Sequence, residues 1–226
     1  MTSSNTSNSV LILGATGRIG LEILYQLSKH NSKPDIHAFV RDPTKLSPSD
    51  RALFKSIVKG DARSSYDIKE AIDETNAGVV VIAVGNGDNV AKSDIRTTNA
   101  HAVVAVLDQP QYSHIHAVVI SSNGAGPTKI KVGMGIGKMI AFHLRHVLRD
   151  HTGQEAALVP IMDRTVLLRP TALTDKEPTG KPVYFGDKDK PPTINISRTD
   201  VAAVVAVEIC DGTSDGGKII NLTNAK

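Results

Sequence analysis

Residues 10–20, Val-Leu-Ile-Leu-Gly-Ala-Thr-Gly-Arg-Ile-Gly, constrain the fold more than any other stretch of this chain. A continuous apolar run is typical of a parallel strand that is buried on both faces. Here such a run leads directly into Gly14, Gly17 and Gly20, and an amphipathic run follows through Leu27. The order predicts a strand, a tight turn and a helix.

Each glycine of this turn has a separate physical role. Gly14 allows a sharp turn at the end of the strand, Gly17 allows the backbone to approach a ligand, and Gly20 allows the helix to pack closely on the sheet. The amides and positive dipole end of the helix can then bind a pyrophosphate. The spacing is G-x-x-G-x-x-G rather than G-x-G-x-x-G, so a glycine-rich turn without a ligand is the alternative. Its place at the first strand–helix junction favours dinucleotide binding.

Composition narrows the class of protein. At 226 residues with 40% hydrophobic content, the chain can build one large domain or two small ones, with a sizeable core. A net charge of +3 does not indicate a nucleic-acid partner, and the single cysteine, Cys210, suits a reducing compartment. No apolar run approaches the roughly 20 residues of a membrane span. Residues 1–9 are polar and lack the features of a secretory signal. We expect a disordered arm over 1–9, a single domain over 10–226, no membrane partner and a cytoplasmic location.

The residues after the second expected strand, 36–40, bear on the choice of cofactor. Arg41 and Asp42 come about 20 residues after the glycines, where NAD-binding folds place an acid for the ribose hydroxyl and NADP-binding folds tolerate an arginine for the 2′-phosphate. A guanidinium can bind phosphate through two hydrogen bonds. Arg41 therefore favours NADP(H), with Arg18 as a second cation. The alternative for each arginine is a solvated surface residue, and Asp42 leaves NAD open.

Further expected strands end in loops that would line the same edge of a sheet. In open α/β sheets, ligands bind outside the carboxyl ends of the strands. The third strand, 54–60, is followed by Asp61, which either touches the adenine or caps the helix that starts near Tyr66. The fourth, 78–85, brings Val84 and Gly85 near the ribose and pyrophosphate. The fifth, 116–120, ends in Ser121 and a glycine-bearing loop where a nicotinamide would lie.

The remaining chain contains a basic stretch, a long loop and a final group of short expected strands with one helix. A helical pattern starts at Lys138 and runs to His151, and a metal site at His143 and His146 lacks an evident third ligand. A strand over 163–170 precedes the irregular segment 174–193, which we expect to cover the substrate. A strand at 194–197, a helix over 200–209 capped by Ser197 or Thr199, and a strand at 218–222 complete the chain. Strands alternating with helices predict a Rossmann-type, doubly wound parallel sheet with helices on both faces and a small C-terminal substrate cap.

With these motifs placed, the chain resembles the atypical short-chain dehydrogenase/reductases, the NAD(P)H-binding proteins of the flavin reductase/biliverdin-IX-beta reductase and NmrA-like types. The resemblance covers nearly the whole chain and rests on 14–20, 40–42, 60–61, 84–86, 121–122, 146–149, 168–171 and 196–202. It implies NADP(H) as cofactor. The cofactor-binding residues that we expect, from the motifs and the resemblance together, are Gly14, Thr16, Gly17, Arg18, Ile19, Gly20, Arg41, Asp61, Ala62, Val84, Gly85, Asn86, Ser121, Pro170, Thr171 and Ala172.

The catalytic residues match less completely. The wider superfamily uses a serine after the fifth strand and then Tyr-x-x-x-Lys. Here Met134 stands in the tyrosine register and Lys138 in the lysine register. Methionine cannot donate a proton. Flavin reductase-like members also lack the tyrosine, and the serine and histidine that line their pockets correspond most closely to Ser122 and His143, with His146 as a competitor.

These observations lead to two functional hypotheses. The first is an NADPH-dependent reductase of a flavin, quinone or carbonyl-type small molecule, with Ser122 and His143 as catalytic candidates. The alternative is a non-catalytic NADP(H)-binding redox sensor of the NmrA-like type. An isomerase or nucleoside-sugar activity is disfavoured, because such enzymes usually retain the Tyr-x-x-x-Lys pair.

Overall fold

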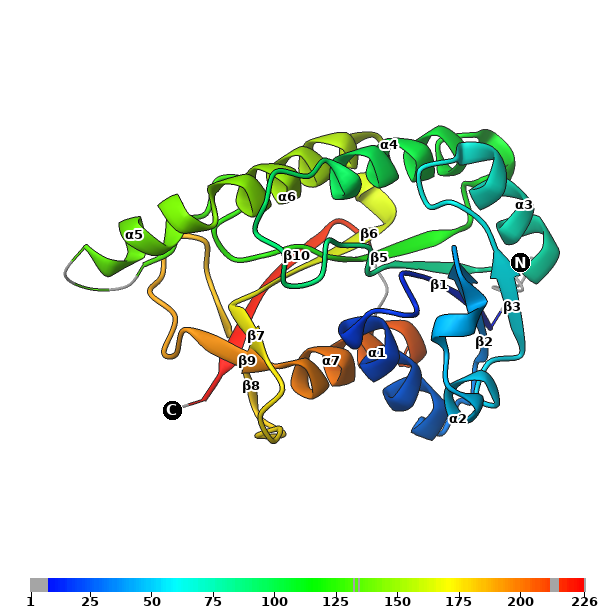
Figure 1. Cartoon of the computed structure of the whole chain (residues 1–226), viewed down its shortest axis with the longest axis horizontal. Helices are drawn as coiled ribbons and strands as arrows, with labels where there is room; N and C mark the ends of the chain where they lie inside the picture. Colours follow the sequence, from blue (N-terminus) through cyan, green and yellow to red (C-terminus); the bar gives the residue numbers. More distant parts are fainter. Residues whose placement is uncertain (1–7, 132, 134, 212–215, 226) are drawn as a thin grey trace, which may run out of the picture.

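The fold is centred on one large sheet. The computed structural model describes residues 8–131, 133, 135–211 and 216–225. Within these residues, eight strands form the sheet in the order β3-β2-β1-β4-β5-β6-β10-β8 (Figure 1). The strands in sheet order are β3 (Ser56–Lys59), β2 (Asp35–Val40), β1 (Ser9–Leu13), β4 (Val79–Ile82), β5 (His116–Ile120), β6 (Thr165–Pro170), β10 (Lys218–Asn224) and β8 (Pro182–Phe185).

The strand order reverses direction between β1 and β4. All neighbouring pairs are parallel except β10 and β8, and β1 pairs with both β2 and β4, so that Leu11 lies opposite His37 and Val80. A crevice opens at such a switch point outside the carboxyl ends of the strands. The expected doubly wound parallel sheet is therefore confirmed, and its switch point lies at the glycine turn.

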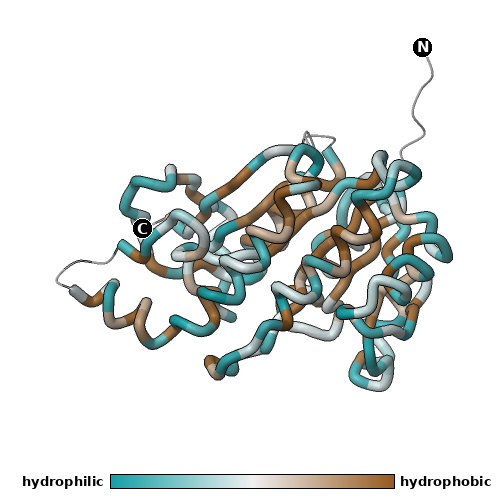
Figure 2. Tube along the Cα trace, turned by 90° about the horizontal axis from the view of Figure 1, so that it is seen from above, coloured by the Kyte–Doolittle hydropathy of each residue, from teal (hydrophilic) through white to brown (hydrophobic). Residues whose placement is uncertain are grey.

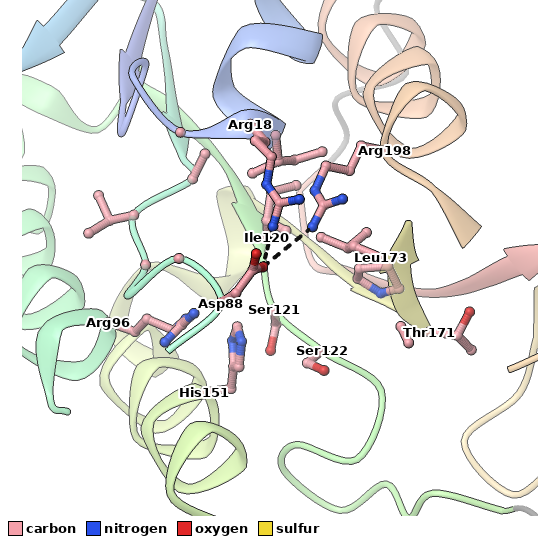
Figure 3. A pocket seen from close by; sticks show the side chains of 18 residues that line it. Arg18, Asp88, Arg96, Ile120, Ser121, Ser122, His151, Thr171, Leu173 and Arg198 are labelled. Atoms are coloured by element: carbon pink, nitrogen blue, oxygen red, sulfur yellow. Dashed lines mark hydrogen bonds and ion pairs between the residues drawn. The ribbon is translucent and has the colours of Figure 1, made fainter. Parts of the chain in front are cut away.

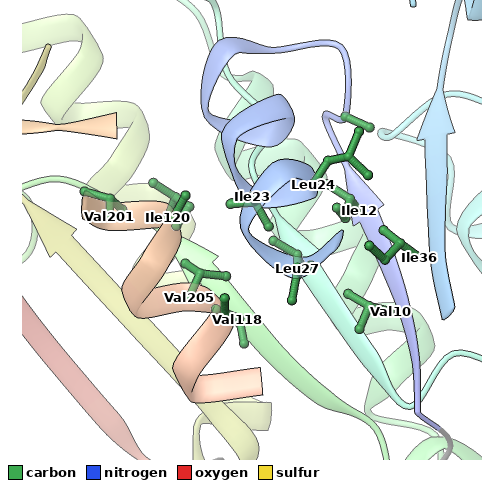
Figure 4. Close-up of a cluster of buried hydrophobic side chains, with 14 of the residues drawn as sticks. Val10, Ile12, Ile23, Leu24, Leu27, Ile36, Val118, Ile120, Val201 and Val205 are labelled. Atoms are coloured by element: carbon green, nitrogen blue, oxygen red, sulfur yellow. The ribbon is translucent and has the colours of Figure 1, made fainter. Parts of the chain in front are cut away.

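Helices cover both faces of the sheet. On one face lie α1 (Arg18–Lys29) and α7 (Arg198–Cys210); on the other lie α3 (Ser65–Thr75), α4 (Ile95–Leu107) and α6 (Arg145–Ala157) (Figure 1). Strand β1 serves both layers, because successive side chains of a strand point to opposite faces. Val10 and Ile12 pack with Leu24 under α1 (Figure 4), whereas Leu11 and Leu13 join the core beneath α3 and α4. Burial on both faces explains the unbroken apolar run.

Smaller elements lie around this framework. Strands β7 (Ala172–Thr174) and β9 (Asn195–Ser197) form a separate two-stranded parallel sheet, and α5 (Ile136–His143) projects from one end of the molecule (Figure 1). Hydrophobic residues concentrate along the strands and inner helix faces (Figure 2). The remaining short helices are η1 (Pro43–Lys45), α2 (Pro48–Arg51), η2 (Pro110–Tyr112) and η3 (Val159–Arg164). No helix in the described part of the chain is long and apolar enough to cross a membrane.

Three expectations from the sequence need correction. Ser9, assigned to a disordered arm, begins β1 and pairs with Asp35; residues 1–7 lie outside the described part. The segment 174–193 is not wholly irregular, because it contains β8, which pairs antiparallel with β10. The helix expected from Lys138 onward is two helices that meet at Leu144. The cap of α7 is settled in favour of Ser197, whose hydroxyl accepts a hydrogen bond from the Asp200 amide.

Candidate functional site

Two cavities meet at the carboxyl ends of the central strands. The glycine-turn cavity, of about 360 Å³, is lined by Gly14, Thr16, Gly17, Phe39, Val40, Arg41, Asp42, Lys45, Gly60, Asp61, Ala62, Arg63, Ala83, Val84, Gly85, Asn86, Ser93 and Ile95. The central cavity, of about 300 Å³, is lined by Gly17, Arg18, Ile19, Ala83, Val84, Gly85, Gly87, Asp88, Arg96, Ile120, Ser121, Ser122, His151, Pro170, Thr171, Ala172, Leu173 and Arg198. Their common residues, Gly17 and 83–85, make them one continuous trough.

Of the cofactor-binding residues expected from the sequence, Gly20 is the exception that lines neither cavity. It is buried in the first turn of α1, where a Cβ would lie 2.4 Å from the Gly14 carbonyl oxygen. Gly14 itself has a φ of +90°, and a Cβ there would lie 2.6 Å from the Ala83 oxygen. These two glycines therefore shape the turn, whereas a Cβ at Gly17 would have only the Gly14 oxygen near it, at 3.2 Å. The turn is open on the side of Gly17.

The N-terminus of α1 faces this open side. Gly17 is the N-cap residue, and no side chain accepts a hydrogen bond from the first turn. Uncapped amides at a helix N-terminus form an anion site. The structure therefore fits the pyrophosphate of a dinucleotide, with the amides of Arg18 and Ile19 at the first two helical positions.

Three cations surround the far end of the glycine-turn cavity: Arg41, Lys45 and Arg63. The neighbouring Asp42 is occupied differently. Its Oδ1 accepts hydrogen bonds from the Thr44 amide at 3.0 Å and the Thr44 hydroxyl at 2.6 Å, and these bonds hold the pKa of the Asp42 carboxyl below its usual range. Asp42 thus caps η1. With Arg41, Lys45 and Arg63 set against Asp42 and Asp61, the described lining of this cavity carries a net positive charge.

The two roles considered for Asp61 can now be separated. The cap of α3 is Ser64, whose hydroxyl accepts from the Asp67 amide at 3.1 Å. Asp61 does not cap this helix; its Oδ1 accepts from the Arg63 amide at 3.0 Å, and the residue lines the glycine-turn cavity beside Ala62. Its position is compatible with contact to an adenine.

Ion pairs cross one side of the central cavity (Figure 3). Arg18 pairs with Asp175 at 2.6 Å and with Asp88, while Arg198 pairs with Asp175 and lies 3.9 Å from Asp88. The arginines come from the first turns of α1 and α7, and the acids come from two loops. Arg198 was not anticipated; its signal in the sequence is a basic residue directly after the helix-capping Ser197.

The floor of the central cavity holds a histidine that sequence reasoning missed. His151, on α6, faces the cavity with Ser121 and Ser122 (Figure 3). Its Nδ1 lies 3.3 Å from Gln154 Oε1, and burial, reinforced by the charge of Arg96, lowers the pKa of His151 to about 3. The imidazole is therefore neutral at pH 7. Ser122 is half-buried, and its hydroxyl donates to the Asn123 carbonyl at 3.3 Å.

The structure does not bring His143 to Ser122. His143 is exposed at the end of α5 and lines none of the cavities described here. Lys138 is also exposed on α5, away from the central cavity, and Met134 lies outside the described residues. Within the described part of the chain, no group of three His, Cys, Asp or Glu side chains is placed to hold a metal ion. The sequence predicted correctly that a histidine follows β5 on a helix. It did not show which helix face points into the central cavity, and therefore not that His151 is the histidine there.

A buried charge network supports this floor. Glu155 on α6 accepts from Ser121 Oγ at 2.6 Å and binds Arg169 through two hydrogen bonds of 2.9 and 2.7 Å. Arg169 also contacts Asp187 at 3.2 Å, and Asp187 accepts from Asn221 at 2.7 Å. Glu155 and its hydrogen bonds hold the pKa of Arg169 above its usual value despite burial. The network joins the end of β5 to the 174–193 segment.

This fold and trough define a dinucleotide-binding Rossmann protein. The chain belongs to the NAD(P)H-binding family, which its residues 14–211 match. The family resemblance drawn from the glycine turn and the later loops is thereby confirmed.

Two curated relatives match part of the chain. Sterol-4-alpha-carboxylate 3-dehydrogenase (decarboxylating) of Saccharomyces cerevisiae is 37% identical over 122 residues, 51% of this chain and 34% of that protein. The Candida albicans protein of the same name is 30% identical over 128 residues, 53% of this chain and 35% of that protein. The match therefore spans about a third of the length of these relatives.

Solved structures match nearly the whole chain. A Bacillus halodurans protein described as an NAD-dependent epimerase/dehydratase has a TM-score of 0.74 and 23% identity, covering 96% of this chain and 94% of that one. A Veillonella parvula short-chain dehydrogenase/reductase in complex with NADP has a TM-score of 0.73 and 17% identity, again covering 96% of this chain and 94% of that one. ChuY, an anaerobilin reductase of Escherichia coli O157:H7, has a TM-score of 0.70 and 18% identity, covering 95% of this chain and 96% of that one. At these identities the likeness shows the fold.

Proposed function

We propose that this protein is an NADPH-dependent oxidoreductase that reduces a small molecule of the flavin, quinone or carbonyl type. The observation that carries the proposal is the continuous trough, which runs from Arg41 past the N-terminus of α1 to Ser122, His151 and Pro170. A dinucleotide laid along it has its adenosine end among cations and its other end beside a hydroxyl and an imidazole. The single cysteine, whose pKa is raised by burial, suits a reducing cytoplasm.

The preference for NADP(H) over NAD(H) rests on the cations at the adenosine end. Arg41, Lys45 and Arg63 line that end, and Asp42 is committed to Thr44. A ribose 2′-phosphate gains charge-assisted hydrogen bonds from these cations, whereas a ribose hydroxyl has only the Oδ2 of Asp42 to bind, because Oδ1 already accepts two hydrogen bonds from Thr44. The NADP-bound Veillonella parvula structure of the same fold is in keeping with this choice.

The residues of the trough have distinct tasks in this proposal. The bound cofactor supplies a hydride. The α1 N-terminus holds the pyrophosphate, and Arg18 and Arg198 exchange their carboxylate partners for phosphate oxygens. Pro170, Thr171 and Ala172 form the wall beside the nicotinamide site.

Proton transfer falls to Ser122 and a water molecule. The low pKa of His151 keeps its imidazole neutral at pH 7, so it acts as a hydrogen-bonding partner rather than as a cationic acid. The Ser122 hydroxyl orients the substrate oxygen or the water that delivers the proton. In this proposal His151 takes the place in the pocket that the sequence suggested for His143.

Stopped-flow measurement of NADPH oxidation with a panel of flavins, quinones and aldehydes tests the proposal. We expect turnover with at least one acceptor class, a large loss of kcat in Ser122→Ala, and no change in His143→Ala, which serves as the matched control. Absence of turnover with every acceptor, while NADPH still binds, would refute the oxidoreductase.

A non-catalytic NADP(H) sensor is the second candidate. It is favoured by the neutral His151 and by the positions of Lys138 and His143 outside the central cavity, because the described lining of that cavity then contains no lysine, tyrosine or protonated histidine to donate a proton. Calorimetry distinguishes the two functions. A sensor binds oxidised and reduced cofactor with different affinities and never consumes NADPH, whereas the enzyme oxidises NADPH with an acceptor.

A further inference from the structure

A third cavity adjoins the floor of the central cavity. This aliphatic cavity, of about 110 Å³, is lined by Ser122, Asn123, Ile130, Lys131, Ile140, Leu144, Thr171, Ala172, Pro191 and Ile194. It shares Ser122, Thr171 and Ala172 with the central cavity. At roughly 30 Å³ per water molecule, its volume corresponds to about four waters, or to one part of a small organic molecule.

The lining is apolar at its centre and charged at one point. Six of its side chains are aliphatic or proline, and they come from the loop after β5, from α5 and its C-cap, from β7 and from residues 191–194. Among the described residues that line it, Lys131 is the one that carries a charge. An apolar pocket with one cation selects a ligand that has an apolar body and one anionic group.

Lys131 has donors to spare for such a group. Its ammonium donates to the Lys188 carbonyl, and an ammonium has three donors in all. Within the described part of the chain, no carboxylate forms an ion pair with Lys131. Two donors thus remain for an oxyanion at a partly buried position.

The surroundings reinforce the positive charge. A neighbouring hollow of about 460 Å³ shares Ile130 and Lys131 with the aliphatic cavity, and Lys129 and Lys138 line it too. Its described lining contains no aspartate or glutamate. The charged side chains in the described linings of these two cavities are therefore all lysines, and their charge repels a cationic ligand.

We propose that the substrate is an amphipathic anion, whose apolar ring or chain occupies the aliphatic cavity and whose carboxylate binds Lys131. The reducible group then lies at Ser122, where the aliphatic cavity opens into the central cavity. This inference rests on the proposed function, because only an enzyme has a substrate. The preference of the site for an anionic ligand, however, can be measured by binding alone. It is therefore tested without turnover.

Isothermal titration calorimetry with naphthalene-1-carboxylate and the isosteric neutral naphthalene-1-carboxamide provides the test. Both ligands are titrated into the full chain with and without NADP⁺. We expect the carboxylate to bind at least about tenfold more tightly than the amide, as a charge-assisted hydrogen bond implies. Lys131→Met should abolish this preference, and Lys131→Arg should retain it. Lys29→Met, at an exposed lysine of α1 that lines none of these cavities, is the matched control and should retain it as well.

Two outcomes would overturn the proposal: equal affinities of the wild type for the two ligands, including no binding of either, or the same loss in Lys29→Met as in Lys131→Met. Thermal unfolding of each variant shows whether it has folded, and Lys131→Arg keeps the test valid if Lys131→Met has not. NADP⁺ titrations of the same samples report on the cofactor site separately. Failure of the cofactor to bind would refute the proposed function while leaving the carboxylate preference measurable.

Discussion

The two ends of the trough are built in different ways. The dinucleotide half, comprising β1–β4 and the glycine-turn cavity, is shaped by backbone: Gly14, Gly17 and the uncapped start of α1. The substrate half, comprising β5, β6, α5, α6 and the segment 172–197, is held by buried polar side chains such as Glu155 and Arg169. Backbone conformation depends on local sequence, whereas a buried ion pair depends on elements far apart in the chain. Removing a charged side chain should therefore destabilise the dinucleotide half less than the substrate half.

Loss of Glu155 is expected to have the largest effect. Glu155→Ala leaves the buried guanidinium of Arg169 with the partly exposed Asp187 as its remaining carboxylate partner, and removing one member of a buried ion pair costs about 3–5 kcal/mol of unfolding free energy. Urea denaturation measures this loss. The matched control, Glu70→Ala on the exposed surface of α3, should change stability by less than about 0.5 kcal/mol. Similar values for both variants would remove the distinction between the two halves.

The titration of His151 is expected to have the next largest effect. Its pKa lies at about 3 in the folded protein, below the ordinary value of 6.5. Between these two pH values the imidazole is protonated in the unfolded chain and neutral in the native state. The stabilisation is complete above pH 6.5 and is lost as the pH falls towards 3. At pH 4.5 the loss should be about 3 kcal/mol. Urea denaturation of the wild type and His151→Asn at pH 7.5 and 4.5 should show that the variant lacks this part of the pH dependence; parallel curves would contradict it.

In the dinucleotide half, Arg41→Ala should affect binding rather than folding. Removing the guanidinium should weaken NADPH by roughly 10- to 100-fold and leave NADH nearly unchanged, since only NADPH carries a 2′-phosphate. Calorimetric titration of both cofactors measures the ratio. Equal losses for NADPH and NADH would exclude a 2′-phosphate role for Arg41.

The smallest effect is expected at Asp42. Because its carboxylate is bonded to Thr44, Asp42→Asn keeps a capping oxygen and should shift the NADPH/NADH affinity ratio by less than about threefold. A selective loss of NADH affinity in fluorescence titrations would show instead that Asp42 contacts a ribose hydroxyl. In that case Asp42 would bind the ribose of NADH, while Arg41 binds the 2′-phosphate of NADPH.

The same contrast explains how far the sequence could predict the molecule. The glycine turn, the alternation of strands and helices and the position of Arg41 after the second strand follow from local patterns, because a strand, its turn and its helix are contiguous. His151 could not be identified in this way: three histidines lie in one basic stretch, and the break between α5 and α6 at Leu144 decides which of them faces the cavity. Strand β8 was missed because Pro182 and Gly186 enclose only three apolar residues, and its pairing partner β10 is distant in the chain.

The position of β10 has a consequence for the order in which the protein is assembled during synthesis. This strand lies between β6 and β8. The Leu222 carbonyl accepts a hydrogen bond from the Thr171 amide, and the Thr223 hydroxyl bonds to the hydroxyls of Thr171 and Thr193. While residues 218–224 are still inside the ribosome, the emerged chain already contains every residue of the glycine-turn cavity. Every residue that lines the glycine-turn cavity and the central cavity therefore leaves the ribosome before β10, and the strand that joins β6 to β8 is the last part of the sheet to be added.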